Sequence, residues 1–521
     1  MRPFSFSSQK TSPGVLRAST GSLEAYFAPF RSHIIGINQD FESPCGRQRL
    51  LYADWTATGR AYRPIEIALQ ENILPYFANT HTDTSFTGRK MTAAYEEAKS
   101  IIKAHVHAGA DDKLVFCGSG MTAAVNKLQR IMGLRQPQWA MGHIRPDETD
   151  RPLVLVTHME HHSNHISWLE TIATVEVIAP GEDGNVDLDN LRQLLTQYAS
   201  RKLKIATVTA CSNVTGIETP YHVIASILHE HDGFCFVDFA ASAPYTDIDM
   251  HPIDPQEKLD AIYFSGHKFL GGPGTPGILI FNKQLYGPGV PDQPGGGTLL
   301  YSNPWGAREY LQDIEQREDG GTPPILQAIK AGMCIRLKEE MGVGNIRARE
   351  GELAKALFEG LSAIREIEVL APANKERLGV VSFVPKGMHY NTVVQALNDR
   401  YGIQCRGGCS CAGTYGHFLL NIDAPHSYAI LDRLKAGDPA AKPGWVRLSV
   451  HPTTTDAEIV YIIEAVQAVV TSPQLAGPDP RLAEPSPRLT ETTTGPEELV
   501  KRPDDVSCLS WHPSKPMILS L

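Results

Sequence analysis

Residues 261–277 read AIYFSGHKFLGGPGTPG, and this stretch decides the fold. Its first residues, AIYF, have the apolar and aromatic character of a short buried strand. The strand runs directly into Ser265, Gly266, His267 and Lys268, and a glycine-rich turn follows. A lysine at such a strand end faces a crevice and is partly desolvated, which lowers its pKa and suits its amine to a Schiff base. Lys268 is therefore the first candidate catalytic residue.

Short apolar segments of the same kind recur along the chain, namely LVFCG, LVLVTH, IATVTA, FCFVDFA and GILIF. Between them, apolar residues recur at helical spacing, as in Leu188, Leu191, Leu194, Leu195 and Tyr198. Strands that alternate with amphipathic helices predict an α/β fold with a mainly parallel sheet. In such sheets ligands bind beyond the carboxyl ends of the strands.

A second chemistry-bearing residue, Asp238, ends the segment FCFVD. A carboxylate at that edge can hold a positively charged ring nitrogen. Taken singly, an aspartate at a strand end is most often a turn cap, and a lysine is most often a solvated surface charge. In this order and on consecutive strands, Asp238 and Lys268 match the pattern by which class V aminotransferases hold pyridoxal phosphate (PLP).

The chain resembles that family from about Leu51 to about Val470, and within it the cysteine desulfurase and selenocysteine lyase branch. The resemblance implies PLP as cofactor and the α/β PLP-dependent transferase fold type I. It also implies that Lys268 carries the cofactor and that Asp238 keeps the pyridine nitrogen protonated. Residues 160–164, EHHSN, are similar to the family's Glu-His-His-Ala-Asn, which makes His161 the residue stacked on the ring.

A phosphate site is predicted where Gly118-Ser119-Gly120-Met121-Thr122 opens a helix that continues TAAVNKL. Free backbone N–H groups at a helix start, together with a threonine hydroxyl, suit a phosphate. In the family, a threonine at the position of Thr322 reaches the phosphate of the neighbouring subunit, which implies a homodimer. The predicted phosphate site comprises Gly120, Met121, Thr122, Ser265, His267 and Thr322.

The resemblance also assigns the substrate end of the site. Asn213 corresponds to the family asparagine near the cofactor's phenolic oxygen and the substrate carboxylate. Arg447, in GWVRLSV, resembles the arginine that binds the α-carboxylate of a small amino-acid substrate as a bidentate fork. One position departs from the pattern, because Ala241 stands where desulfurases usually have glutamine. That difference removes a hydrogen bond to the phenolic oxygen, which changes the tuning of the cofactor and leaves the choice of reaction open.

Residues 406–413, RGGCSCAG, resemble the mobile desulfurase loop and place Cys411 at the persulfide-forming position. Cys409 falls where many members have histidine. The thiols allow three interpretations: Cys411 as nucleophile with Cys409 as relay or disulfide partner, a metal clip with Cys405, or inert small residues. The spacing C-x3-C-x-C lacks the paired C-x2-C form of structural zinc sites, so no metal site is predicted.

These residues predict a desulfurase that removes sulfur from L-cysteine through a Cys411 persulfide, gives L-alanine, and passes the sulfur to an acceptor protein. Two alternatives stay open. The first keeps the cofactor but changes the reaction to that of a C–S lyase, aminotransferase or epimerase, because one fold hosts all of these. The second is a PLP fold that has lost catalysis and serves as a binding protein.

The composition argues against two classes of binding partner, nucleic acids and membranes. A net charge of −10 without a dense basic block argues against nucleic acid, and no apolar stretch is long enough to cross a bilayer. Nine cysteines without framework spacing are typical of reduced intracellular thiols. We expect a cytoplasmic protein. The first acidic residue is Glu24, so a mitochondrial transit peptide is the alternative to a disordered lead-in.

Turn-forming residues and changes in composition predict the domain organisation. Gly, Thr and Pro near residue 320 separate the parallel sheet from a region whose strands would include VVSFVP and WVRLSV, and a Pro-rich tail follows. The predicted parts are a lead-in at 1–25, a segment packing on the small domain at 26–66, a large PLP-binding domain at 67–320, a small C-terminal α/β domain at 321–471 and the tail at 472–521.

Overall fold

A seven-stranded sheet organises the larger part of the computed structural model, which describes residues 21–80, 82, 84–137, 147–287 and 289–472. The strand order is β4-β10-β9-β8-β7-β5-β6, and only β10 runs antiparallel to its neighbours. The strands are β4 (Asp112–Cys117), β5 (Leu153–Thr157), β6 (Thr174–Ile178), β7 (Lys204–Thr209), β8 (Phe234–Asp238), β9 (Ala261–Ser265) and β10 (Gly277–Asn282). The prediction of a mainly parallel sheet is confirmed, although β6 was missed because its residues are mostly half-buried.

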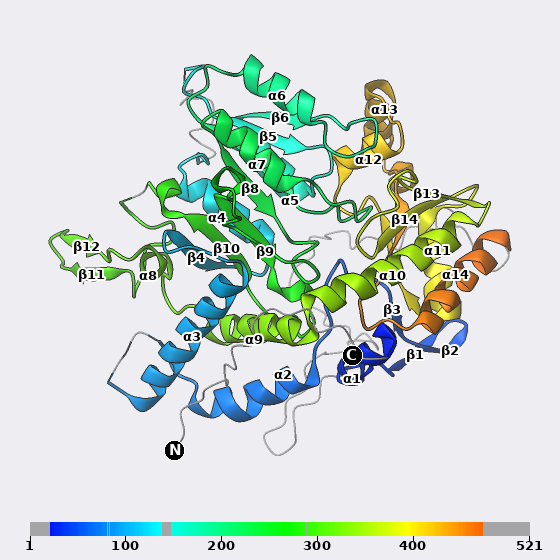
Figure 1. Ribbon diagram of the computed structural model, residues 1–521, viewed down its shortest axis with the longest axis horizontal. Coiled ribbons are helices and arrows are strands. Elements are labelled where there is room, and N and C mark those ends of the chain that lie inside the picture. The colour runs from blue at the N-terminus through cyan, green and yellow to red at the C-terminus, as the bar shows by residue number, and fades with distance from the viewer. Residues whose placement is uncertain (1–20, 81, 83, 138–146, 288, 473–521) are drawn as a thin grey trace, which may run out of the picture. The chain divides into compact units, whose positions relative to one another are not determined.

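Both faces of this sheet are buried, which explains why its strands are almost continuously apolar. Successive residues of β4 go to opposite sides: Leu114 and Phe116 belong to one apolar cluster, Val115 and Cys117 to another. The helices around the sheet cover these two faces (Figure 1). They include α3 (Phe86–His105), α4 (Met121–Ile131), α5 (His162–Leu169), α6 (Leu188–Gln197) and α7 (Tyr221–Glu230).

A second, antiparallel sheet has the order β13-β14-β17-β16 and its own apolar cluster. It contains the two strands predicted for this region, here β14 (Val380–Pro385) and β17 (Trp445–Ser449), with β13 (Ile367–Val369) and β16 (Arg406–Gly408). The long helices α9 (Ile325–Met341) and α10 (Val343–Ser362) lead from the first sheet to the second (Figure 1). The second sheet is packed by α10, α11 (Tyr390–Tyr401) and α14 (Asp456–Thr471).

The segment that precedes the first sheet lies against this second region. β3 (Leu51–Tyr52) pairs in parallel with β15 (Ile403–Gln404), and Asp54 forms a bridge with Ser449. Arg31 from α1 (Leu23–Ser32) donates to Glu458 at 2.6 Å. The remaining elements are β1 (Asp40–Ser43), β2 (Gly46–Arg49), α2 (Arg63–Ala68), β11 (Leu299–Ser302), β12 (Arg308–Tyr310), α8 (Ile314–Glu318), α12 (Gly413–Leu419) and α13 (Ala424–Lys435).

All described residues belong to one compact unit, and the separate apolar cluster of the second sheet supports our proposal of a small domain within it. Residues 1–20 of the predicted lead-in, and the tail beyond residue 472, lie outside the described residues. Within the described ranges, no helix has both the length and the apolar character required for a membrane span. The eight cysteines in these ranges are unpaired thiols.

Candidate active site

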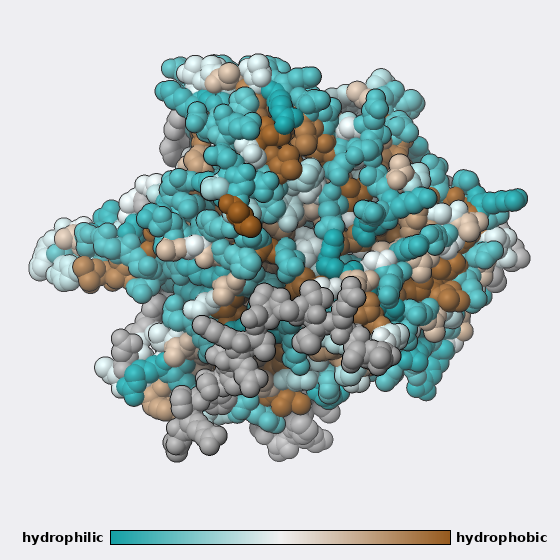
Figure 2. All heavy atoms as spheres, viewed as in Figure 1, coloured by the Kyte–Doolittle hydropathy of each residue, from teal (hydrophilic) through white to brown (hydrophobic). Residues whose placement is uncertain are grey.

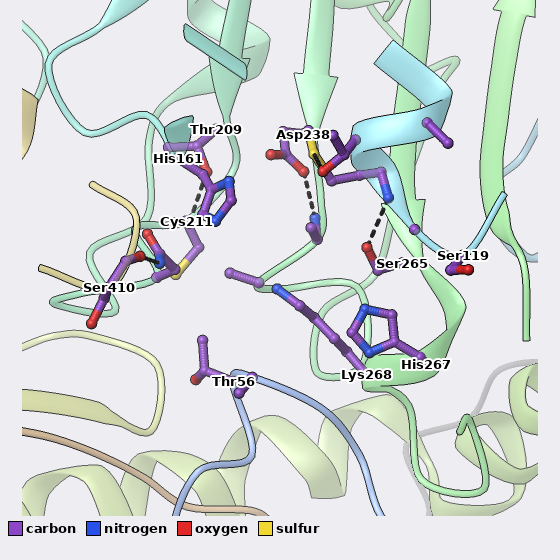
Figure 3. Close-up of a pocket in the computed structure, with 18 of the residues that line it drawn as sticks. Thr56, Ser119, His161, Thr209, Cys211, Asp238, Ser265, His267, Lys268 and Ser410 are labelled. Carbon is purple, nitrogen blue, oxygen red and sulfur yellow. Dashed lines mark hydrogen bonds between the residues drawn. The ribbon is translucent and has the colours of Figure 1, made fainter. Parts of the chain in front are cut away.

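A cavity of about 670 Å³ opens at the carboxyl edge of the large sheet, and the second sheet closes its other side. The strands β4, β5, β7, β8 and β9 all end there, so the turns that follow them supply most of the wall. Figure 3 shows Lys268, Asp238, His161 and Ser265 around this space. The predicted site residues that line it are His161, Gly120, Met121, Thr122, Asn213, Asp238, Ser265, His267, Lys268 and Arg447.

Two predicted site residues do not line the cavity. The residue Cys411 is exposed, although its neighbour Ser410 forms part of the wall. Thr322 is also exposed, and its hydroxyl accepts a hydrogen bond from the Asn79 side chain at 3.2 Å. The predicted thiol and the predicted partner-subunit contact therefore both lie outside this space.

Lys268 extends its amine into the middle of the cavity (Figure 3). The short 3-10 turn after β9, Gly266–Lys268, aims the side chain, and desolvation lowers the pKa of the amine to about 8. Asp238 opposes this shift by favouring the charged form, and Arg447 reinforces it. A usable fraction of the amine is therefore neutral near neutral pH, as a nucleophilic lysine requires.

Asp238 stands at the end of β8 and is 3% exposed. The Ala240 N–H donates to Oδ1 at 2.8 Å and fixes the carboxylate at the cavity wall. Burial raises the pKa of this carboxyl to about 6, against the opposing effects of the Ala240 hydrogen bond and the Lys268 charge. A cationic group facing Asp238 would offset this cost of burial.

The predicted phosphate cradle surrounds the start of α4. The Met121 N–H donates to the Ser265 hydroxyl at 2.9 Å, which ties the helix start to the end of β9. A Cβ at position 120 would lie 2.9 Å from Ser265 Oγ, so a side chain there would displace the hydroxyl that accepts from Met121. Burial lowers the pKa of the neighbouring His267 to about 4, so its ring is neutral. Backbone N–H groups at a helix start, beside small polar side chains, form a site for an anion.

His161 forms the opposite wall as the N-cap of α5. Its Nδ1 accepts from the Ser163 N–H at 3.1 Å, and this bond fixes the orientation of the ring. Burial and the charge of Lys268 lower the pKa of His161 to about 3. A neutral ring of fixed orientation at this position suits stacking on a flat aromatic ligand.

Arg447 and Arg406 form the end of the cavity nearest the second sheet, and Asp54 pairs with both of them. Arg447, 2% exposed, donates to Asp54 Oδ1 at 2.6 Å and to the Asn213 carbonyl at 3.0 Å. Arg406 pairs with the other Asp54 oxygen at 3.3 Å. Among the described residues, two buried polar atoms here have no hydrogen-bond partner: Arg447 Nε and Asn213 Oδ1. This end of the cavity can therefore accept a further polar group.

The cysteine loop contacts the cavity through its backbone. Ala412 N–H donates to the Cys409 carbonyl at 3.0 Å, and Ser410 and Cys411 both have positive φ, 51° and 56°. The side chain of Asn213 donates to the Ser410 carbonyl at 2.7 Å. Burial raises the pKa of the Cys405 thiol to about 12, which makes it unreactive. In the part of the chain that the structure describes, no group of three or more His, Cys, Asp or Glu could hold a metal ion.

Several wall residues, and Asp54, which pairs with two arginines of the wall, were not predicted as site residues. Asp54 had a readable signal, because it ends the apolar segment LLYAD much as Asp238 ends FCFVD. Arg406 stands in the cysteine-loop motif but received no role. The others had no signal that marked them as site residues, since they are common residue types brought together only by folding: Thr56, Ala57, Ser119, Ala123, Asn126, Arg130, Thr209, Cys211, Ala240, Ala241 and Ser410.

Comparison with known proteins agrees with this geometry. The family model of class-V aminotransferases matches residues 51–462. The chain belongs to the class-V aminotransferase family. It is 30% identical over 369 residues to a probable cysteine desulfurase of Staphylococcus aureus, covering 70% of this chain and 84% of the relative. It is 31% identical over 373 residues to one of Halalkalibacterium halodurans, with the same shares covered.

Solved structures of related proteins have the same fold. The apo cysteine desulfurase from Thermococcus onnurineus superposes with a TM-score of 0.69 at 25% identity, covering 85% of this class-V chain and 98% of the other. The cysteine desulfurase CsdA from Escherichia coli gives 0.66 at 20% identity with the same coverage. The predicted transferase fold type I is confirmed.

As a member of this family the protein is a PLP-dependent enzyme that acts on a small amino acid, and the cavity fits that cofactor. Asp238 is a buried carboxylate whose charge a protonated ring nitrogen would balance. The start of α4 is an anion cradle in which a side chain at Gly120 would displace the Ser265 hydroxyl. His161 presents a neutral ring, and the Lys268 amine points into the space between them.

Proposed function

We propose that this enzyme is a cysteine desulfurase, which converts L-cysteine to L-alanine and carries the removed sulfur on Cys411. One observation carries the proposal: the loop that bears an exposed cysteine also supplies Ser410 to the wall of the cavity that holds Lys268. The two relatives described above, at 30% and 31% identity, are named as probable cysteine desulfurases, which supports the same reaction.

In this proposal the residues of the large sheet hold PLP. Asp238 would bind the ring nitrogen, His161 would pack on the ring face, and the backbone at the start of α4 would bind the phosphate with Ser265 and His267. When bound, PLP acts as an electron sink that stabilises negative charge on the substrate's α-carbon. Lys268 would anchor the cofactor, and its amine would move the proton at that carbon.

The substrate's carboxylate binds at the arginine end. Arg447 lines the cavity and offers a planar fork of donors. Asn213 lies next to it and offers its amide group. Asp54 pairs with both Arg447 and Arg406, so this end holds two positive charges and one negative charge. That balance favours an amino acid with a single carboxylate.

Sulfur transfer then needs the thiol of Cys411. Its thiolate attacks the substrate sulfur, the carbon–sulfur bond breaks, and the carbon takes up a proton. The net change is one L-cysteine and one enzyme thiol to one L-alanine and one enzyme persulfide, so no external oxidant is required. The exposure of Cys411 supports delivery of the sulfur to an acceptor protein.

We further propose a homodimer. Thr322 is exposed and lies outside its own cavity, as expected of a residue that reaches the phosphate of a partner subunit. The β11–β12 hairpin supports the same assembly, because it projects from the large sheet and exposes Leu300, Tyr301 and Trp305. Figure 2 shows apolar residues on this hairpin at the left edge of the molecule. Exposed aromatic and apolar side chains of this size are typical of protein interfaces.

A second candidate reaction is a C–S lyase that releases sulfide directly. It is favoured by the position of the Cys411 residue, which does not line the cavity, and by Ala241, which does line it in place of the usual glutamine. The two reactions differ in their need for the thiol.

The deciding experiment incubates PLP-replete protein with L-cysteine and quantifies alanine and sulfide with and without a thiol reductant, beside Cys411→Ala. Sulfide that depends on reductant, equals the alanine formed and is lost in the variant establishes the desulfurase. Sulfide formed at the parent rate by the variant overturns the persulfide role and favours the lyase.

A further inference from the structure

The loop after β16 carries a second thiol, Cys409, two residues before Cys411. Ser410, the residue between them, lines the cavity, whereas neither cysteine does. Cys411 is exposed and Cys409 is half-buried, and both are free thiols. The two cysteines therefore share the side of the loop that faces away from the substrate cavity.

A tight turn brings these two residues close together. The Ala412 N–H donates to the Cys409 carbonyl at 3.0 Å, and the two central residues, Ser410 and Cys411, have φ of 51° and 56°. Positive φ at both central positions is the pattern of a type I′ turn. Even in an extended chain, residues two apart are separated by at most about 7 Å, and a turn shortens that span. Disulfides join Cα atoms that are about 4.4–6.8 Å apart, so Cys409 lies within reach of Cys411.

The third cysteine of this segment, Cys405, is a poor partner for Cys411. It packs against the apolar cluster of the second sheet, and burial raises the pKa of its thiol to about 12. The thiol therefore stays protonated near neutral pH, and thiol exchange requires a thiolate. Of the two other cysteines in residues 405–411, Cys409 is the one that the turn places beside Cys411.

We propose that Cys409 is the resolving thiol of the loop. Its thiolate attacks the Cys411 sulfur of the persulfide, a Cys409–Cys411 disulfide forms, and the outer sulfur leaves as hydrosulfide. One persulfide and one thiolate give one disulfide and one hydrosulfide ion, so atoms and charge balance. Cys409 is oxidised and the departing sulfur is reduced, so no further oxidant takes part. The inference rests on the proposed function, because the Cys411 persulfide is its starting point.

The resulting disulfide has to be reduced before the next turnover. It would close a very short loop, and a disulfide that departs from relaxed geometry is more easily reduced. Exposed or strained disulfides are the labile, catalytic kind. Cys411 is the exposed end of the pair, where a thiol reductant can attack and restore both thiols by exchange. The pair therefore releases the sulfur as sulfide when no acceptor protein takes it.

The test follows a single turnover in the PLP-loaded full chain without reductant, with L-cysteine at less than one equivalent per site. Alanine and sulfide are quantified, and the loop is analysed by mass spectrometry after alkylation with iodoacetamide. Trypsin cleaves after Arg406, which separates Cys405 from the other two thiols. In the parent we expect one sulfide per alanine, and a matching amount of loop peptide that is unalkylated and lighter by two hydrogens.

Variants of the two neighbouring cysteines separate the resolving role from other sources of sulfide. Cys409→Ser should lower the ratio of sulfide to alanine at least about tenfold, because a thiol in the same loop attacks much faster than one in solution. Its loop peptide should carry one additional sulfur on Cys411, and added dithiothreitol should release that sulfur as sulfide. Cys405→Ala is the matched control in the same segment, and its ratio should equal that of the parent.

A substrate-free arm tests the pairing of the thiols apart from turnover. Diamide should oxidise the loop of the parent enzyme to the same disulfide, whereas Cys409→Ser should give none. A parent loop that keeps both thiols free under diamide would show that the two sulfurs do not meet, which overturns the inference.

Three further outcomes of the turnover experiment overturn the resolving role: a parent loop peptide that keeps the additional sulfur, an additional sulfur on Cys409, or a Cys409→Ser protein that releases sulfide like the parent. Cys411→Ala distinguishes these from failure of the proposed function. If Cys411→Ala loses alanine formation while the parent keeps a stable persulfide, only the resolving role falls. If Cys411→Ala forms alanine and sulfide at the parent rate, the desulfurase proposal itself falls.

Discussion

The two walls of the cavity are built in different ways. On the large-sheet side, Asp238 and Lys268 follow adjacent strands whose two faces are both buried, and each side chain is aimed by a short turn. On the opposite side, the loop after β16 exposes Cys411, contains two residues with positive φ, and is attached by a few hydrogen bonds.

This contrast separates two tasks of the proposed reaction. Groups that hold a cofactor and move protons need fixed positions, which a packed sheet supplies. A group that collects sulfur in the cavity and delivers it outside must move, and loops with few buried contacts are the parts of a protein that move. Substitutions on each wall test this division.

Lys268→Ala should remove the reactive amine from the large-sheet side of the cavity. Without the amine, the cofactor has no covalent anchor and the α-proton has no carrier, so alanine formation from L-cysteine should fall about a thousandfold. Alanine quantification measures this loss, and the visible absorbance of the lysine–cofactor Schiff base should vanish with it. Unfolding curves that match the parent's would show that the fold is intact. Activity within tenfold of the parent would move the catalytic role away from this lysine.

Cys411→Ala should abolish sulfur transfer to the loop and leave the cofactor-binding residues of the large sheet unchanged. The Schiff-base absorbance should persist, while alanine formation falls about a hundredfold, equivalent to ~2.7 kcal/mol of activation free energy. Cys409→Ala is the matched control on the same loop. If Cys409 is a relay, its loss should slow sulfur release more than alanine formation; if it is inert, both rates should stay near the parent's. Equal losses in the two variants would contradict a unique role for Cys411.

The large sheet could be predicted from sequence because a strand that is buried on both faces is apolar at nearly every position. Segments such as AIYF and FCFVD are apolar throughout, and the residue after each strand lies at a known edge of the sheet. The positions of Asp238, Lys268 and Gly120 around one cavity therefore followed from strand order. The apolar pattern of the edge strand β6 is weaker, since its residues are mostly half-buried.

The other wall could not be predicted in the same way, because its contacts join residues far apart in the chain. Asp54 pairs with Arg447, and Asn213 bonds Ser410, across intervals that no local pattern records. The outward position of Cys411 depends on positive φ values that ordinarily favour glycine, and nothing in the motif RGGCSCAG predicts which of its residues adopts them. The motif resemblance identified candidate residues such as Cys411, but it did not predict where their side chains point.

Asp238→Asn should show how much the buried Asp238 carboxylate destabilises the folded protein. The pKa of Asp238 is raised to about 6, so the folded protein holds its proton more tightly than the unfolded chain. Stability is therefore lost as pH rises from about 4 to about 6, and the full loss is present at pH 8. In the cofactor-free protein at pH 8, the neutral asparagine should raise the free energy of unfolding by about 2 kcal/mol.

Urea unfolding of both cofactor-free proteins measures this difference, and pH 5 provides the control. There the wild-type carboxyl is largely protonated when folded, so the gain should shrink to about half. The same variant should lose alanine formation, because an amide cannot balance a ring cation. A variant that is less stable at pH 8 would show that the Asp238 carboxylate already has a partner in the cofactor-free protein.

Arg447→Lys tests the residue that joins the two walls, since Arg447 belongs to β17 of the second sheet yet lines the cavity beside Lys268. A lysine keeps the charge but cannot reproduce the planar fork that reaches Asp54 and a carboxylate together. KM for L-cysteine should rise about tenfold, the loss of one charge-assisted hydrogen bond, with kcat changed less. Asp54→Asn should raise KM by a smaller factor, because it loosens the arginine without removing it. A fall in kcat at constant KM would instead mean that Arg447 acts mainly in the transition state, and the carboxylate site would then belong to Arg406.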